Sequence, residues 1–310
     1  MRSSNMTVGR QRLHPKGPEF SRLVAGLWRA FQGEETREPI GLARWIDACL
    51  ELGITSFDHA DIYGDYQVEA LFGRALREWR GDRGRIELIT KCGIMLESSQ
   101  RPTHRVKHYD TSRAHILASV ENSLRHFGTD YLDLLLLHRP DPLMNADETA
   151  AALDEVCQSG KVRYVGVSNH TPEQIELLQS RLSRPLVTNQ IELSVLHLEP
   201  LHDGTLEHAQ RLRMAPMAWS PLGGGNLFSA QGERERRVRE ALVSVGAEHG
   251  HDNPGAIAIA WLMNHPARPV PVLGTSRVRR LRDLVSGVSL ALTRQQWFSI
   301  WQASAGHPVP

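Results

Sequence analysis

Short, continuously apolar runs alternate with longer segments of helical period along this chain. Strands that are buried on both faces read as continuous apolar runs, whereas half-exposed strands alternate apolar and polar residues. The runs therefore predict buried strands of a parallel sheet. The eight predicted strands are residues 22–27, 54–57, 86–91, 132–138, 162–167, 186–190, 215–219 and 270–273.

Helical periodicity fills the intervals between these runs. Gly53, Gly128 and Gly160 supply C-terminal stops, while Thr171 and Pro172 form an N-cap followed by proline at the first helical position. The predicted helices are residues 40–52, 68–79, 111–127, 146–158, 172–182 and about 206–212, with further helices within 234–265 and one from 277. Trp297, Ile300 and Trp301 recur at helical spacing and predict an extra helix within residues 293–310, on the outside of the fold.

Eight strand–helix units follow one another without a Pro/Gly/Ser-rich linker. A length of 310 residues by itself allows either two ordinary domains or one large barrel. The repeated unit favours a single (β/α)8 TIM barrel over a doubly wound sheet. We therefore predict one domain over residues 1–310, with a polar N-terminal extension over residues 1–20 and the extra C-terminal helix.

Composition and charge limit the classes of partner and the cellular compartments that suit this chain. The chain is 41% hydrophobic and 23% charged, and 36 basic residues against 35 acidic ones give a net charge of +1. Such a balance provides no field for nucleic acid or an anionic membrane, which favours a small-molecule partner. The N-terminal region has no apolar signal core, and no apolar run reaches about 18 residues. Cys49, Cys92 and Cys157 have neither disulfide nor zinc spacing. We expect a cytoplasmic protein.

Polar residues that suit acid–base chemistry stand at the ends of three successive predicted strands. Barrel enzymes place their chemistry at the carboxyl ends of the strands, and here these ends supply Asp58 with Tyr63, then Lys91, then His138. A buried lysine requires a carboxylate, so we expect Lys91 to pair with Asp58. The ammonium is expected to lower the pKa of Tyr63, and His138 to help place a carbonyl oxygen. Together these residues predict a proton donor for a reducible carbonyl.

The order of these motifs resembles the aldo-keto reductases, from about residue 22 to residue 282. Its details are similar to the bacterial YdhF-type branch. The motifs are Phe57-Asp58 with Tyr63-Gly64, Ile89-Thr90-Lys91, Leu134 to His138, Gly160-Lys161-Val162-Arg163, Gly166-Val167-Ser168-Asn169, Asn189-Gln190 and Trp219-Ser220-Pro221-Leu222-Gly223-Gly224-Gly225.

The resemblance implies a monomeric or weakly associating barrel that binds NADP(H) without a Rossmann fold and transfers hydride from nicotinamide C4 to an aldehyde or ketone. In that scheme Tyr63 is the general acid, Lys91 and Asp58 support it electrostatically, and His138 orients the substrate oxygen. The same resemblance assigns the cofactor to residues after five strands. They are Gly26, Leu27 and Trp28; Ser168, Asn169 and Gln190 for the carboxamide; Trp219 for stacking; Ser220, Pro221, Leu222, Gly223 and Leu227 for the pyrophosphate; and Gly274, Thr275, Ser276 and Arg280 for the adenosine end.

Residues 274–282 open the last predicted helix, where helix N–H groups and a guanidinium suit a 2′-phosphate, and Arg280 is the best match to the arginine that the family uses there. The alternative is a solvated basic helix face. Gly274 stands where many members of the family carry a phosphate-binding lysine. The preference for NADP(H) over NAD(H) is therefore expected to depend on Arg280.

Other readings of the barrel stay open at this point. A redox-sensing subunit that binds nucleotide and turns over slowly would share the fold. A metal-dependent hydrolase or a phosphate-binding isomerase would also be a barrel, but no cluster of metal ligands stands at the strand ends; His59 beside Asp58 and Asp61 has no further partner in the pattern, so we predict no metal. Substrate choice would lie in the loops 28–38, 95–110 and 193–203, with Trp28 as a candidate wall.

Overall fold

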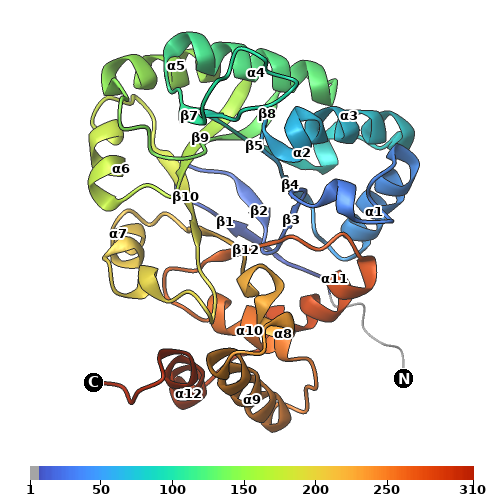
Figure 1. Cartoon of the computed structure of the whole chain (residues 1–310), viewed down its shortest axis with the longest axis vertical. Coiled ribbons are helices and arrows are strands. Elements are labelled where there is room, and N and C mark those ends of the chain that lie inside the picture. Colours follow the sequence, from blue (N-terminus) through green and yellow to red (C-terminus); the bar gives the residue numbers. More distant parts are fainter. Residues whose placement is uncertain (1–6) are drawn as a thin grey trace.

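The computed structural model describes residues 7–310, and its centre is a closed barrel of eight parallel strands (Figure 1). Their order around the barrel is β10-β11-β12-β3-β4-β5-β8-β9, and pairing of β12 with β3 closes it. All eight predicted strands are confirmed within two residues at either end. The strands are β3 (Val24–Gly26), β4 (Ser56–Asp58), β5 (Glu87–Cys92), β8 (Leu132–Leu137), β9 (Val162–Ser168), β10 (Leu186–Glu192), β11 (Met217–Trp219) and β12 (Val270–Leu273).

Helices surround the barrel, as Figure 1 shows. Thr171 caps α6 with a reciprocal capping box, and Gly128 ends α4 at φ 68°, so these predicted boundaries are confirmed. A Cβ on Gly73 would lie 1.9 Å from the carbonyl oxygen of His126, so α3 and α4 can pack this closely only around glycine. The helices are α1 (Pro39–Glu51), α3 (Val68–Trp79), α4 (Arg113–Phe127), α5 (Ala146–Gln158), α6 (Pro172–Gln179), α7 (Thr205–Arg211), α9 (Glu233–Glu248), α10 (Pro254–Met263) and α11 (Val278–Val285).

The extra C-terminal helix is confirmed as α12 (Arg294–Ala305), which lies beside α9 on the outside of the ring (Figure 1). Trp297 of α12 stacks on Trp261 of α10 with ring centroids 4.7 Å apart and an interplanar angle of 9°. Each indole N–H donates to the backbone oxygen of the other tryptophan at 3.0 Å. This tryptophan pair fastens α12 to α10.

Two antiparallel hairpins were not predicted. The first, β1 (Arg10–Arg12) with β2 (Glu19–Ser21), covers the N-terminal end of the barrel, and buried Leu13 and Phe20 join the core inside it. The N-terminal extension is therefore an integral part of the fold from residue 7 onward, and its first six residues lie outside the described residues. The second hairpin, β6 (Ile94–Met95) with β7 (His108–Tyr109), stands between β5 and α4.

Short helical turns occupy several of the remaining loops. They are α2 (Tyr63–Tyr66), α8 (Asn226–Ser229) and the 3-10 turns Ala30–Gln32, Arg83–Arg85, Glu199–Leu201, Gly223–Gly225 and Ser286–Ser289.

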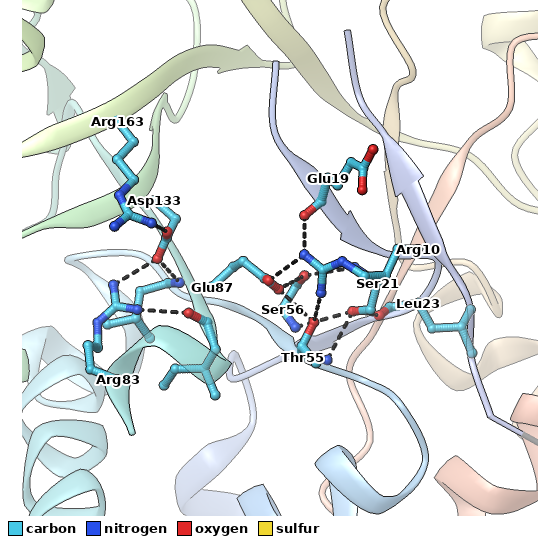
Figure 2. Close-up of polar contacts among 12 residues, drawn as sticks. Arg10, Glu19, Ser21, Leu23, Thr55, Ser56, Arg83, Glu87, Asp133 and Arg163 are labelled. Carbon is cyan, nitrogen blue, oxygen red and sulfur yellow. Dashed lines mark hydrogen bonds and ion pairs between the residues drawn. The ribbon is translucent and has the colours of Figure 1, made fainter. Parts of the chain in front are cut away.

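Two carboxylates and their polar partners connect the elements at the N-terminal end of the barrel (Figure 2). Glu87 accepts the hydroxyls of Thr55 and Ser56, each at 2.7 Å, and pairs with Arg10 of the first hairpin at 2.7 Å. Asp133 forms a separate centre. Its carboxylate pairs with Arg83 at 2.7 Å and Arg163 at 3.0 Å, and it accepts the N–H of Leu88 at 2.9 Å. These contacts leave the opposite end of the barrel to the candidate chemistry.

Candidate active site

The carboxyl ends of β4 and β5 bring Asp58, Lys91 and Tyr63 into contact. These strands are neighbours with Asp58 opposite Ile89, so Lys91 projects from the next inward position of β5. The Lys91 ammonium lies 2.8 and 2.7 Å from the two oxygens of Asp58 and 3.1 Å from the Tyr63 hydroxyl. The side chains of Lys91 and Asp58 are only 1% and 3% exposed. The predicted Lys91–Asp58 pair is confirmed, and the Lys91 ammonium also forms a hydrogen bond with the Tyr63 hydroxyl.

Burial and charge act in opposite directions on this group. Burial alone would lower the pKa of Lys91, but Asp58 and then Tyr63 raise it, and the net result is a pKa above the usual value. For Tyr63 burial is the largest influence and raises the pKa, Lys91 lowers it and Asp58 raises it again, so the net pKa is raised. The expectation that the pKa of Tyr63 is lowered overall is therefore wrong, although Lys91 by itself acts in the expected direction. Desolvation of the phenolate outweighs attraction to an ammonium that Asp58 already neutralises.

His138 faces the same phenol. Its ring centroid lies 5.9 Å from that of Tyr63, and its Nδ1 is buried without a hydrogen-bond partner among residues 7–310. Burial lowers the pKa of His138 well below its usual value, with further lowering by Lys91, Arg139 and Lys107. His138 is therefore a neutral imidazole at physiological pH. Trp28, 57% exposed at the end of β3, packs edge-on against Tyr63 at 4.9 Å.

The three residues that the resemblance assigns to the carboxamide form one hydrogen-bonded chain. Trp219 donates to the Asn169 side-chain oxygen at 2.9 Å, and Asn169 donates to the Ser168 hydroxyl at 2.8 Å. Ser168 in turn donates to the backbone oxygen of Gln190 at 2.8 Å. The Gln190 amide then reaches across the barrel and donates to Asp58 at 2.8 Å. The sequence did not predict this last contact, because β4 and β10 lie on opposite sides of the barrel.

The glycine-rich segment after β11 has an unusual backbone. Ser220 has φ 50°, and Gly223, Gly224 and Gly225 have φ 60°, 65° and 104°. Arg29, from the loop after β3, donates to the carbonyl of Gly224 at 2.8 Å and so joins the first and seventh βα loops.

The other assigned positions in these two loops offer mainly backbone. The side chains of Pro221, Leu227 and Leu27 are buried, Gly26 and Leu222 are half-buried, and Leu27 N–H donates to the carbonyl of Asp58 at 2.9 Å.

The residues assigned to the adenosine end surround the start of α11. Gly274 and Arg280 are exposed, and a side chain at Gly274 would meet no atom within 4 Å. The Thr275 hydroxyl accepts from the N–H of Arg277 at 3.3 Å. Ser276 packs closely against Gly33, in the loop that precedes α1. A Cβ on Gly33 would lie 2.2 Å from the Ser276 hydroxyl oxygen.

Glu35 is the acidic residue at this site that sequence reasoning missed. Its carboxylate accepts the N–H of Val278, the first residue of α11, at 3.2 Å, across 243 positions of the chain. No local pattern marks this contact. The N-terminus of a helix is a favourable position for an anion, and here the Glu35 carboxylate occupies it.

His59 serves the core. Its ring lies 4.4 Å from Phe72 and 4.9 Å from Phe127, and Nδ1 contacts the carbonyl of Ile89 at 3.2 Å. Burial lowers its pKa to about 3, partly offset by the Ile89 carbonyl. Within residues 7–310 no group of three or more His, Cys, Asp or Glu side chains is arranged to hold a metal ion. Over the same residues no helix is long and apolar enough to span a bilayer.

A parallel eight-stranded barrel with this set of residues at its carboxyl rim defines an oxidoreductase of the aldo-keto reductase type. The chain matches the Aldo/keto reductase family over residues 22–305, and it belongs to that family.

Two of the curated relatives that match nearly the whole chain serve as examples. The 6-dehydroglucose reductase of Agrobacterium fabrum is 49% identical over 94% of this chain and 96% of its own length. The oxidoreductase YdhF of Escherichia coli is 46% identical over 98% of this chain and all of its own length. Among solved structures, the holo form of the aldo-keto reductase AKR11C1 from Bacillus halodurans superposes with a TM-score of 0.80 at 25% identity, covering 97% of this chain and 98% of that one.

Proposed function

We propose that this enzyme reduces an aldehyde or ketone to an alcohol with NADPH, and that Tyr63 donates the proton. The observation that carries the proposal is the buried contact of the Tyr63 hydroxyl with an ammonium held by Asp58, facing a neutral imidazole. A general acid must lie within hydrogen-bond reach of the developing alkoxide, and Tyr63 stands beside His138 at the carboxyl ends of the barrel strands, where a substrate oxygen could meet both side chains.

Each residue has a distinct task in this scheme. His138 can donate a hydrogen bond to the carbonyl oxygen without carrying charge, which fixes the oxygen beside Tyr63. As the oxygen gains negative charge, the Tyr63 proton moves to it and the phenolate that forms is stabilised by Lys91. Asp58 and the Gln190 amide keep Lys91 in place.

The rim fits a nicotinamide nucleotide, which when bound supplies the hydride. The Glu35 carboxylate occupies the N-terminus of α11, where a phosphate group of the nucleotide would bind. Arg280 is exposed two residues into that helix. Trp219 and the Ser168–Asn169–Gln190 chain would hold the ring end, the backbone of residues 220–227 the pyrophosphate, and Arg280 the 2′-phosphate. Gly26, Leu27, Trp28, Gly274, Thr275 and Ser276 would complete the lining.

We take the aldehyde of an oxidised hexose as the first substrate to test. The relative from Agrobacterium fabrum is a 6-dehydroglucose reductase, and the matched lengths of the two chains support a shared substrate class. Trp28, 57% exposed and 4.9 Å from the Tyr63 ring, is the side chain we assign to contact the sugar.

The test is NADPH consumption with Tyr63→Phe. We expect the rate of carbonyl reduction to fall by roughly 10²-fold or more, because the proton donor is lost, while NADPH affinity and thermal stability stay close to those of the wild type. Tyr131→Phe is the matched control, since it removes a phenol hydroxyl near the N-terminal end of β8 and leaves the arginine stacking on its ring. A Tyr63→Phe rate near that of the wild type would remove Tyr63 from the reaction. A wild type that binds NADPH but turns over no carbonyl would favour the redox-sensing alternative.

A further inference from the structure

The second hairpin presents a run of basic residues next to the candidate active site. Residues 101–108 include Arg101, Arg105 and Lys107 and no acidic residue. Pairing of Met95 with His108, and the hydrogen bond from Asp110 N–H to the carbonyl of Gly93 at 3.0 Å, fix the base of this hairpin directly after β5. Lys107, the residue before β7, is therefore expected near the carboxyl ends of the barrel strands.

Arg139 approaches the same point from β8. It follows His138, whose N–H donates to the carbonyl of Cys92 at 2.9 Å, so the ends of β5 and β8 are joined here. The guanidinium of Arg139 lies 5.7 Å from the ring centroid of Trp219. Both Lys107 and Arg139 are close enough to His138 to lower its pKa, after burial and Lys91.

Neither cation has a carboxylate partner within residues 7–310. The acidic residues that flank them in the chain are turned toward the backbone. Asp110 accepts the N–H of Ser112 at 2.9 Å, and Asp141 accepts the N–H groups of Thr111 at 3.1 Å and Leu143 at 2.8 Å. Arg139, next to the substrate-orienting histidine, and Lys107, on the hairpin that follows the neighbouring strand β5, thus both lack a neutralising carboxylate.

We propose that Lys107 and Arg139 bind the oxygen-rich end of the carbonyl substrate, a carboxylate or a set of hydroxyls, and so determine specificity. This inference rests on the proposed function. Arginine can meet a carboxylate with two parallel hydrogen bonds, and lysine adds a point charge on a flexible stem. Hydroxyl oxygens accept the same donors more weakly, because they carry no charge. Arg105 is exposed on the same hairpin, which makes it a control of equal charge.

Three rigid aldehydes distinguish binding of a carboxylate from binding of hydroxyls. They are 4-methylbenzaldehyde, 4-(hydroxymethyl)benzaldehyde and 4-carboxybenzaldehyde. We expect Lys107→Met and Arg139→Met each to lower kcat/KM roughly tenfold for the oxygen-bearing aldehydes. For the methyl compound, and for the KM of NADPH, the change should stay within about twofold. Arg105→Met should leave all three aldehydes unchanged. A loss confined to the carboxylate that shrinks with added salt identifies an anionic substrate, and an equal loss for the hydroxymethyl compound identifies hydroxyls.

Two results would overturn the inference while the proposed function stands. One is an equal loss for the methyl compound in either variant, which would show a general effect on the site. The other is unchanged kcat/KM for both oxygen-bearing aldehydes while wild type reduces all three. If wild type consumes NADPH with none of the aldehydes, including a hexose aldehyde, the proposed function fails and this inference fails with it.

Discussion

Removing the Lys91 ammonium should damage stability and catalysis by separable routes. In Lys91→Met the carboxylate of Asp58, 3% exposed, loses the cation that neutralises it and, among residues 7–310, keeps the Gln190 amide as its one side-chain donor. Breaking a buried ion pair by removing one partner costs about 3–5 kcal/mol. At roughly 2–4 °C of Tm for each kcal/mol in a large domain, Tm should fall by about 6–20 °C.

The double variant Lys91→Met/Asp58→Asn distinguishes the buried charge from simple loss of packing. Asparagine keeps the shape of Asp58 without its charge, so most of the lost stability should return in urea and thermal unfolding. Carbonyl reduction should stay at least about 10²-fold below wild type in both variants, because Tyr63 has lost the ammonium that stabilises its phenolate.

The pH dependence of unfolding gives an independent check. The pKa of Lys91 is raised in the folded chain, so its stabilising contribution is fully present below the pKa of an unfolded lysine and is lost as the pH rises through the folded value. The difference in stability between wild type and Lys91→Met should therefore be constant near neutrality and shrink only in strongly alkaline solution. A Lys91→Met protein as stable as wild type, or a double variant no more stable than the single one, would refute the argument for a buried charge pair.

Two other regions give sharp expectations. Arg280→Ala should weaken NADPH binding by roughly ten- to a hundredfold in a fluorescence titration and leave NADH nearly unchanged, since only the 2′-phosphate needs the guanidinium; equal weakening of both would make α11 a solvated helix. Glu35→Ala should tighten NADPH binding, because it removes the carboxylate at the start of α11, and looser binding would contradict that reason. Asp133→Asn should cost about 2–3 kcal/mol in denaturant unfolding, below the value for a fully buried pair because Arg163 is half exposed, with kcat unchanged; a lower kcat would mean that the two ends of the barrel are coupled.

Sequence reasoning succeeded where the physical signal is local or where burial leaves one choice. Continuous apolar runs located every barrel strand, and the cost of burying Lys91 pointed to Asp58. It failed for the first hairpin, because its strands are short and mostly polar. Arg10, Arg12 and Glu19 are exposed, so the single buried Phe20 does not form an apolar run.

The remaining failures depend on closure of the barrel and on magnitudes. The contacts of Gln190 with Asp58 and of Glu35 with Val278 join residues 132 and 243 positions apart. The pKa of Tyr63 requires the depth of burial, which no pattern of residue types supplies.

Four of the tryptophans give the enzyme two independent optical signals, one from the pair that joins α10 to α12 and one from the active-site end of the barrel. Stacked, nearly parallel indoles couple their electronic transitions, so Trp261 and Trp297 should produce a paired circular-dichroism band that vanishes when α12 detaches. Trp28 and Trp219 stand at the carboxyl rim, where their fluorescence responds to whatever occupies the site. Local opening of the C-terminal helix and occupancy of the rim can therefore be followed in one unlabelled sample, at the same time.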